Sequence, residues 1–123
     1  MKIGIVIVTH IFDIANGLPK IIKEIAPNVP VTAAGGDAHN QVGTDFDKIV
    51  AAIENNEADE VVAFYDFGAA RVNLEMASKL TSKTVHLNKL ALVEGTYATA
   101  ALLEVDVPFE TIEAQLADLA IHK

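Results

Sequence analysis

The sequence predicts an α/β fold, in which helices cover both faces of a central, mainly parallel β-sheet. Three observations lead to this prediction. Four short segments are rich in β-branched or aromatic residues and have the length of strands. The stretches between them are long enough for helices and repeat apolar residues at helical spacing. With 123 residues, 51% of them hydrophobic, the chain can build one core but has little left for a second. We therefore expect a single domain over residues 1–123.

The first expected strand, residues 3–8, is an unbroken apolar run around Gly4. A run that is apolar on both faces is typical of a parallel strand covered by helices on each side. Three further segments have similar length and composition, and we expect strands at 29–34, 60–65 and 84–87.

Helices are expected between and after these strands. Pro19 lies inside the first helical pattern and disfavours helical geometry at Leu18, so we expect a kink or a late helix start there. The third helix is expected at 73–80 and a fourth at 92–103, and Pro108 with Glu110 opens a C-terminal helix. The apolar faces are Ile14, Leu18, Ile21, Ile22 and Ile25 in the first helix, Phe46, Ile49, Val50 and Ile53 in the second, and Ile112, Leu116 and Leu119 in the last.

Composition limits the classes of function. The net charge of −8 has the wrong sign for binding a nucleic acid backbone or an anionic membrane. It suits a basic protein partner, or serves solubility alone. The absence of cysteine fits a reducing compartment. The N-terminal apolar run is too short for a signal sequence or a membrane span, so we expect a cytoplasmic protein.

Chemistry in an open parallel sheet gathers beyond the carboxyl ends of the strands. The expected strand ends bring His10, the pair Gly35 and Gly36, Asp66 and Gly68 to one edge. A histidine between a strand and a helix lies near free backbone amides and the positive end of the helix dipole, which suits a phosphoryl group. Such a histidine can equally be a packed or loop residue. The glycines allow close backbone approach, but ordinary turns use glycine too.

Asp66 has two possible roles. Its carboxylate could accept the other ring N–H of His10 and so decide which nitrogen faces a phosphoryl donor. It could instead cap the third helix. The remaining histidines, His39, His86 and His122, read as structural or solvent-facing, and no spacing marks a metal site. No GxxxxGK[ST] or GxGxxG motif is present, so we expect no cofactor or nucleotide on this chain itself.

Several segments, in order over nearly the whole chain, carry a family resemblance. They read IVIVTH, AAGG, GTDFDKI, FYDFGAARVNLEMA and LVEGTYATAALL. Together they resemble the phosphotransferase subunits of phosphoenolpyruvate-dependent dihydroxyacetone kinases, which are mannose-type IIA domains. The resemblance implies the mannose-type IIA fold and a homodimer. It also implies that His10 carries the phosphoryl group, that Asp66 orients it, and that the surrounding rim is formed by Thr9, Gly35, Gly36, Thr44 and Gly68.

The resemblance also implies partners. The phosphoryl group would come from phosphoenolpyruvate through enzyme I and HPr, and would pass to ADP held with magnesium by the subunit DhaL. DhaL would then phosphorylate dihydroxyacetone on the subunit DhaK. Two alternatives remain open. Sugar-transporting mannose-type IIA domains share the fold, but they typically differ at 66–70 and lack the segment LVEG at 92–95. A non-catalytic module that binds a small ligand is the other.

Overall fold

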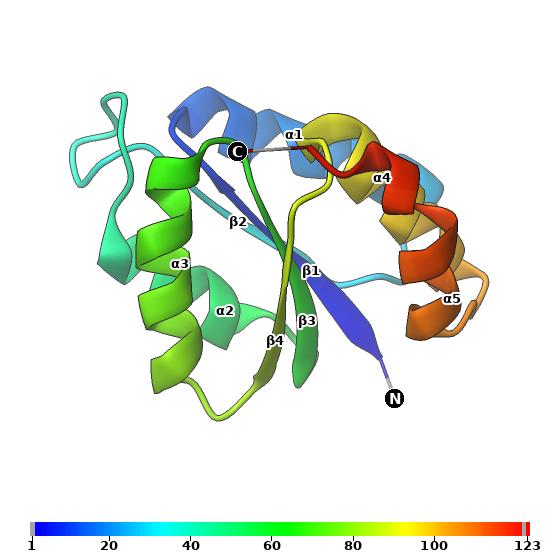
Figure 1. The fold of residues 1–123 in the computed structure, drawn as a ribbon. Coiled ribbons are helices and arrows are strands. Elements are labelled where there is room, and N and C mark those ends of the chain that lie inside the picture. Colours follow the sequence, from blue (N-terminus) through cyan, green and yellow to red (C-terminus); the bar gives the residue numbers. More distant parts are fainter. Residues whose placement is uncertain (1, 122) are drawn as a thin grey trace.

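The computed structural model describes residues 2–121 and 123, and strands and helices alternate along the chain (Figure 1). Four strands form one sheet in the order β2-β1-β3-β4, and every neighbouring pair is parallel. The predicted α/β class with a parallel central sheet is therefore confirmed. The elements are β1 (Ile3–Thr9), α1 (Phe12–Ile25), β2 (Val31–Gly35), α2 (Phe46–Asn55), β3 (Glu60–Tyr65), α3 (Gly68–Leu80), β4 (Thr84–Asn88), α4 (Leu92–Glu104), α5 (Phe109–Gln115) and the 3₁₀ turn η1 (Ala117–Leu119).

Helices cover both faces of the sheet, as expected. In Figure 1, α2 and α3 lie on one side, and α1, α4 and α5 lie on the other. Each side encloses its own apolar core. Successive residues of β1 alternate between the two cores, with Val6 and Val8 in one and Ile5 and Ile7 in the other. This explains why β1 is apolar on both faces.

Several predicted boundaries differ from those observed. Strand β2 begins at Val31 rather than residue 29, because Pro30 has no N–H for the ladder and the Val29 amide bonds the Ala26 carbonyl in a turn. Helix α1 begins at Phe12 and continues through Pro19, so the late start considered at this proline does not occur. Helix α3 begins at Gly68, five residues earlier than predicted.

The C-terminal segment returns to the carboxyl edge of the sheet. The predicted last helix ends at Gln115, and η1 follows it. An antiparallel bridge then joins Leu90 to Ala120, and the Ile121 amide donates to the Lys89 carbonyl at 3.0 Å. This return brings the end of the chain close to the start of α3 (Figure 1).

Across residues 2–121 and 123, no helix is both long and apolar enough to span a bilayer. In the same described part, no group of three or more His, Asp or Glu side chains is placed to hold a metal ion.

Candidate functional site

The residues that follow β1, β2 and β3 meet at one point because of the strand register. Thr9 pairs with Gly35, and Val8 pairs with Tyr65. The next residues along these strands, His10, Gly36 and Asp66, therefore lie together at the carboxyl edge. Strand β1 has β2 on one side and β3 on the other, so this is the place where the strand order reverses. Open parallel sheets bind ligands at such a place.

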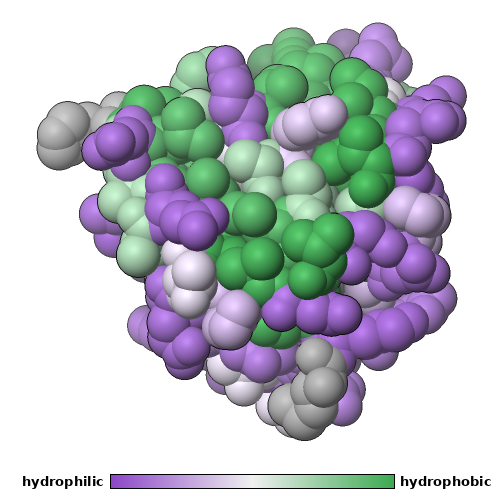
Figure 2. Space-filling model, turned by 90° about the vertical axis from the view of Figure 1, so that its right-hand side faces the viewer, coloured by the Kyte–Doolittle hydropathy of each residue, from purple (hydrophilic) through white to green (hydrophobic). Residues whose placement is uncertain are grey.

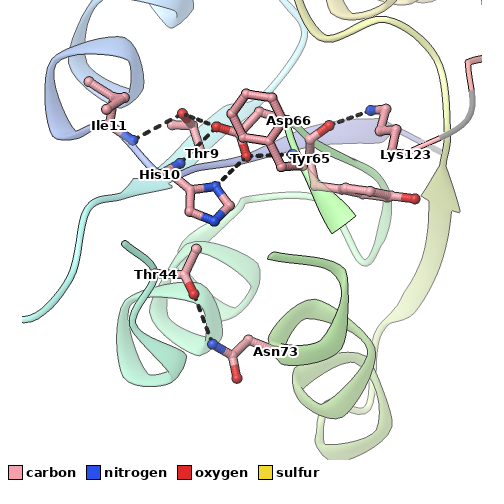
Figure 3. Close-up of polar contacts among 9 residues, drawn as sticks. Thr9, His10, Ile11, Thr44, Tyr65, Asp66, Asn73 and Lys123 are labelled. Atoms are coloured by element: carbon pink, nitrogen blue, oxygen red, sulfur yellow. Dashed lines mark hydrogen bonds and ion pairs between the residues drawn. The ribbon is translucent and has the colours of Figure 1, made fainter. Parts of the chain in front are cut away.

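The Asp66 carboxylate holds His10 by both its ring and its backbone. Oδ1 lies 2.8 Å from His10 Nδ1, and Oδ2 accepts the His10 backbone N–H at 2.8 Å. These contacts fix the ring relative to β3 (Figure 3). The two side chains are only 17% and 10% exposed, so the pair is screened from bulk water without being sealed from it.

This geometry also selects the tautomer of His10. An ionised carboxylate only accepts hydrogen bonds, so Nδ1 must carry the proton that it donates to Asp66. In the neutral ring, Nε2 then has a free lone pair. In Figure 3 that second nitrogen points away from Asp66, toward the side where Thr44 and Asn73 lie. The ring nitrogen available as a nucleophile is therefore Nε2.

Two further donors complete the shell around Asp66. The Thr9 hydroxyl donates to Oδ2 at 2.9 Å, and the Phe67 amide donates to Oδ1 at 2.8 Å. Burial alone would raise the pKa of the Asp66 carboxyl. The hydrogen bonds from His10, Thr9 and Phe67 outweigh burial and hold this pKa below its usual value of 3.8. Asp66 is therefore a carboxylate at neutral pH.

Capping of the third helix is not the main role of Asp66. The N-cap residue of α3 is Phe67, and Asp66 lies one position before it. Three of the four hydrogen bonds to its carboxylate come from Thr9 and His10, at the end of β1. Of the two roles considered from the sequence, the contacts favour orientation of the histidine.

The expected rim residues differ in how they lie. Thr9 is fully buried, and its hydroxyl oxygen also accepts the Ile11 amide at 3.2 Å, so it supports the site from beneath. Gly35 and Gly36 are also buried. A Cβ on Gly35 would lie 2.7 Å from the Ile11 carbonyl oxygen, and Gly36 has φ +78°, a conformation that favours glycine. These two glycines let the backbone pass close to the start of α1.

Thr44 and Gly68 lie on the side of the site formed by α2 and α3, away from the start of α1. The Thr44 hydroxyl oxygen accepts a hydrogen bond from Asn73 Nδ2 at 3.0 Å, which ties the segment before α2 to α3 (Figure 3). Gly68 is the first residue of α3 and faces the backbone of Lys123. The loop between β2 and α2 is anchored as well, because the Gly43 amide donates to the His10 carbonyl at 3.0 Å.

Helix α1 begins two residues after His10. Its N-cap is Ile11, whose aliphatic side chain cannot accept from the first-turn amides. The amino end of the helix therefore presents uncapped donors and its positive dipole end close to the histidine. This is the electrostatic setting expected from the sequence for an anionic group.

Two side chains at the site were not singled out in the sequence. The Phe67 ring lies 5.5 Å from the His10 ring, centroid to centroid, and is 64% exposed. The sequence did hold a signal for Phe67, because it is a large apolar residue in a turn, directly after Asp66. Lys123 contacts the end of β3, and no local pattern points to this contact because it depends on the return of the C-terminal segment.

The other histidines lie elsewhere. His39 is exposed in the loop after β2. His86, on β4, has its Nε2 2.6 Å from a Glu60 carboxylate oxygen and its ring 4.5 Å from that of Phe109. His122, which we expected to be structural or solvent-facing, lies outside the described residues.

Comparison with known proteins identifies relatives over the full length of the chain. The family model described as PTS system fructose IIA component matches residues 4–113. The phosphotransferase subunit DhaM of the PTS-dependent dihydroxyacetone kinase of Lactococcus lactis subsp. lactis is 46% identical over 100% of both chains. The phosphoryl donor subunit DhaM of PEP-dependent dihydroxyacetone kinase 1 of Listeria innocua is 45% identical over 96% of this chain and 95% of its own.

The fold also matches a solved structure of a protein of unknown function. Its TM-score is 0.83 at 27% sequence identity, and the match covers 100% of this chain and 98% of that one. The family model and the two full-length relatives agree on one assignment. The chain belongs to the PTS system fructose IIA component family and, within it, to the DhaM subunits of dihydroxyacetone kinases.

Proposed function

We propose that this chain is the phosphoryl donor subunit of a dihydroxyacetone kinase and that it carries the phosphoryl group on His10 Nε2. The observation that carries the proposal is the bond between His10 Nδ1 and Asp66, which leaves Nε2 as the free nucleophile. The names of the two full-length relatives, a phosphotransferase subunit and a phosphoryl donor subunit, support this role.

The reaction has two transfers. In the first, Nε2 attacks the phosphorus of phosphorylated HPr, so one N–P bond breaks in the donor and one forms on His10. The Nδ1 proton stays on the ring, and Asp66 stabilises the positive charge that the imidazole gains. In the second, a β-phosphate oxygen of ADP on DhaL attacks the same phosphorus. The N–P bond then breaks, ATP forms and neutral His10 is regenerated.

No cofactor is required on this chain in the proposed reaction. ADP and magnesium would be held by DhaL, and dihydroxyacetone would be phosphorylated on DhaK. This chain contributes a positioned nucleophile and the electrostatic setting around it.

The surface near His10 supports docking of a protein donor and acceptor. Two exposed apolar side chains lie beside it: Val42, in the loop that the Gly43 amide ties to the His10 carbonyl, and Phe67, whose ring lies against that of His10. HPr and DhaL must both reach the same nitrogen. We therefore expect them to compete for one protomer, and a stable ternary complex of both partners on one protomer would contradict this.

We also propose that the chain forms a homodimer, as the family resemblance implies. Figure 2 shows apolar side chains at the surface on the side of α4 and α5. Among the exposed apolar residues are Val93 on α4 and Leu87 on β4, an edge strand of the sheet. Light scattering should give twice the mass of one chain, and a monomer at micromolar concentration would contradict the proposal.

The test of the carrier role uses phosphoenolpyruvate, enzyme I and HPr. The wild-type protein should gain one acid-labile phosphoryl group, mapped to His10, and should lose it to ADP-loaded DhaL. The variant His10→Ala should gain none while keeping its fold. His39→Ala, which removes an exposed histidine from the loop after β2, is the matched control and should be labelled normally. Label on another residue, or none on the wild type, would overturn the proposal.

A further inference from the structure

The phosphoryl site gathers negative charge. Asp66 is an ionised carboxylate, and a phosphoryl group on His10 would add a charge of about −1.5 to −2 beside it. Asp13 in the first turn of α1, Asp37 in the loop after β2 and Asp45 at the start of α2 belong to the same edge of the sheet. A nearby cation would lower the free energy of holding a further anion here, in addition to the amino end of α1.

Lys123 places a cation at the end of β3, on the side of Asp66 away from His10 (Figure 3). Its ammonium donates a hydrogen bond to the Tyr65 carbonyl, which belongs to the peptide unit that links Tyr65 to Asp66. The same ammonium lies 4.3 Å from the centre of the Tyr65 ring. A carbonyl dipole and an aromatic face are favourable partners for a cation that leaves bulk water.

The backbone holds this lysine in place. The Ile121 amide bonds the Lys89 carbonyl, and the bridge between Leu90 and Ala120 fixes the segment just before it. The Lys123 backbone lies against Gly68, where an added Cβ would be 3.3 Å from the Lys123 carbonyl carbon. The start of α3 and the end of the chain therefore meet directly beside the turn that carries Asp66.

The Asp66 carboxylate acts on the charge of Lys123. Burial lowers the pKa of the Lys123 ammonium, and the nearby Asp66 carboxylate opposes that shift. Since the ammonium bonds the Tyr65 carbonyl rather than the carboxylate, Asp66 keeps its oxygens for Thr9, His10 and Phe67. Lys123 can thus compensate charge without competing with His10 for Asp66.

Other cations of this region already have partners. Lys48 donates to the Gly35 carbonyl at 3.1 Å and to Asn40 at 2.6 Å. Arg71, in the first turn of α3, pairs with Glu75 at 2.5 Å. Neither contact is directed at Asp66.

We propose that Lys123 is a positioning residue of the phosphoryl site: its ammonium compensates the charge of Asp66 and of the phosphoryl group on His10. This inference rests on the proposed carrier function. Its consequence is a phosphohistidine of lower free energy, and hence an equilibrium with phosphorylated HPr that lies further toward this protein.

The test compares Lys123→Met, which removes the charge, with Lys123→Arg, which keeps it. Lys89→Met is the matched control, because it removes one exposed positive charge from the segment after β4, next to the bridge between Leu90 and Ala120. The first measurement is the phosphorylated fraction of each protein at graded ratios of phosphorylated to free HPr. The second is the pKa of the Asp66 carboxyl by carbon-detected NMR on the unphosphorylated protein.

We expect Lys123→Met to lower the equilibrium constant for phosphorylation by roughly threefold to tenfold, the size expected for one charge acting through a partly shielded site. It should also raise the pKa of Asp66. Lys123→Arg should remain within about twofold of wild type, and the Met defect should shrink in high salt. Wild-type behaviour of Lys123→Met would overturn the inference, and so would an equal defect in Lys123→Arg, because packing alone would then explain the effect.

These results remain distinguishable from a failure of the proposed function. If the wild type accepts no phosphoryl group from HPr, the carrier proposal fails. The pKa of Asp66 in Lys123→Met and Lys123→Arg then still decides whether Lys123 compensates its charge.

Discussion

The Thr9 hydroxyl donates to Asp66 Oδ2 at 2.9 Å across 57 residues of sequence, while its own oxygen accepts the Ile11 amide at 3.2 Å. Thr9 thus joins three parts of the site: the carboxylate on β3, the end of β1 and the start of α1. Its side chain is fully buried, so a partner protein does not touch it.

Replacing Thr9 with valine should therefore slow phosphorylation without changing a docking surface. Thr9→Val keeps the shape but leaves the Ile11 amide and one carboxylate lone pair unpaired, which should cost about 1–3 kcal/mol of stability. We expect the single-turnover rate of phosphoryl transfer from HPr to fall by roughly tenfold or less, since the bonds from His10 to Asp66 remain. Thr9→Ser keeps the hydroxyl and should be nearer wild type in rate. Equal rates for Thr9→Val and wild type would show that this hydroxyl does not support catalysis.

Gly35 should tolerate no side chain. A Cβ there would lie 2.5 Å from the Ala15 Cβ and 2.7 Å from the Ile11 carbonyl oxygen, so α1 would have to shift. We expect Gly35→Ala to lose about 1–3 kcal/mol of unfolding free energy in urea and to transfer phosphoryl groups poorly. Gly17→Ala is the control, because an added Cβ in that helical position meets nothing within 4 Å. It should be neutral or stabilising by up to about 1 kcal/mol. Equal unfolding midpoints for the two variants would contradict the prediction.

Lys83 should stabilise the carboxyl end of α2, although it lies 27 to 30 residues further along the sequence. Its ammonium donates to three backbone carbonyls, those of Ile53, Glu54 and Asn56. A cation there satisfies free acceptors and opposes the negative end of the helix dipole. Lys83→Met should therefore lower the unfolding free energy by about 1–2 kcal/mol, whereas Lys20→Met, at an exposed position inside α1, should change it by less than about 0.5 kcal/mol. Denaturant titration of both variants checks this, and equal losses would point to net charge instead.

Asp66 should make part of the stability depend on acid pH. Its pKa is lowered in the folded protein, so the folded state favours the carboxylate. The stability from this shift is fully present above the unfolded pKa of about 4 and is lost as pH falls through the lower folded value. The stability difference between wild type and Asp66→Asn should therefore be larger at pH 6 than at pH 3. Urea unfolding at both pH values measures it, and a difference independent of pH would contradict the shift.

Much of the fold could be predicted because it depends on local pattern. Four apolar strands separated by amphipathic helices lead to a parallel sheet, and β3 begins and ends as predicted. Boundaries were less predictable where the pattern carries no apolar spacing. The first turn of α3, from Gly68, contains residues of small volume and one arginine, so its helical state was not evident before Asn73. The break after Gln115 similarly follows from packing of the C-terminal segment back onto the sheet edge.

The site could be located from the sequence but not assembled from it. His10, Gly35, Gly36, Asp66 and Gly68 were expected at one edge because parallel strands align their carboxyl ends. The sequence left open whether Asp66 orients His10 or caps a helix, and the family resemblance implied a rim position for Thr9. The role of Asp66 and the position of Thr9 both depend on which strands are neighbours in the sheet. They also depend on the direction in which the chain leaves the end of each strand.

The sequence by itself determined the α/β class, the buried character of β1 and the position of His10 between a strand and a helix, because each follows from neighbours along the chain. Only the tertiary structure decided that Asp66 fixes Nδ1 of His10, that the buried Thr9 hydroxyl bonds Asp66, and that the Lys123 ammonium bonds the Tyr65 carbonyl next to Asp66. Those contacts join residues 56 to 58 positions apart. They exist because β3 pairs with β1 and because the C-terminal segment returns to the same edge, and no local pattern encodes either arrangement.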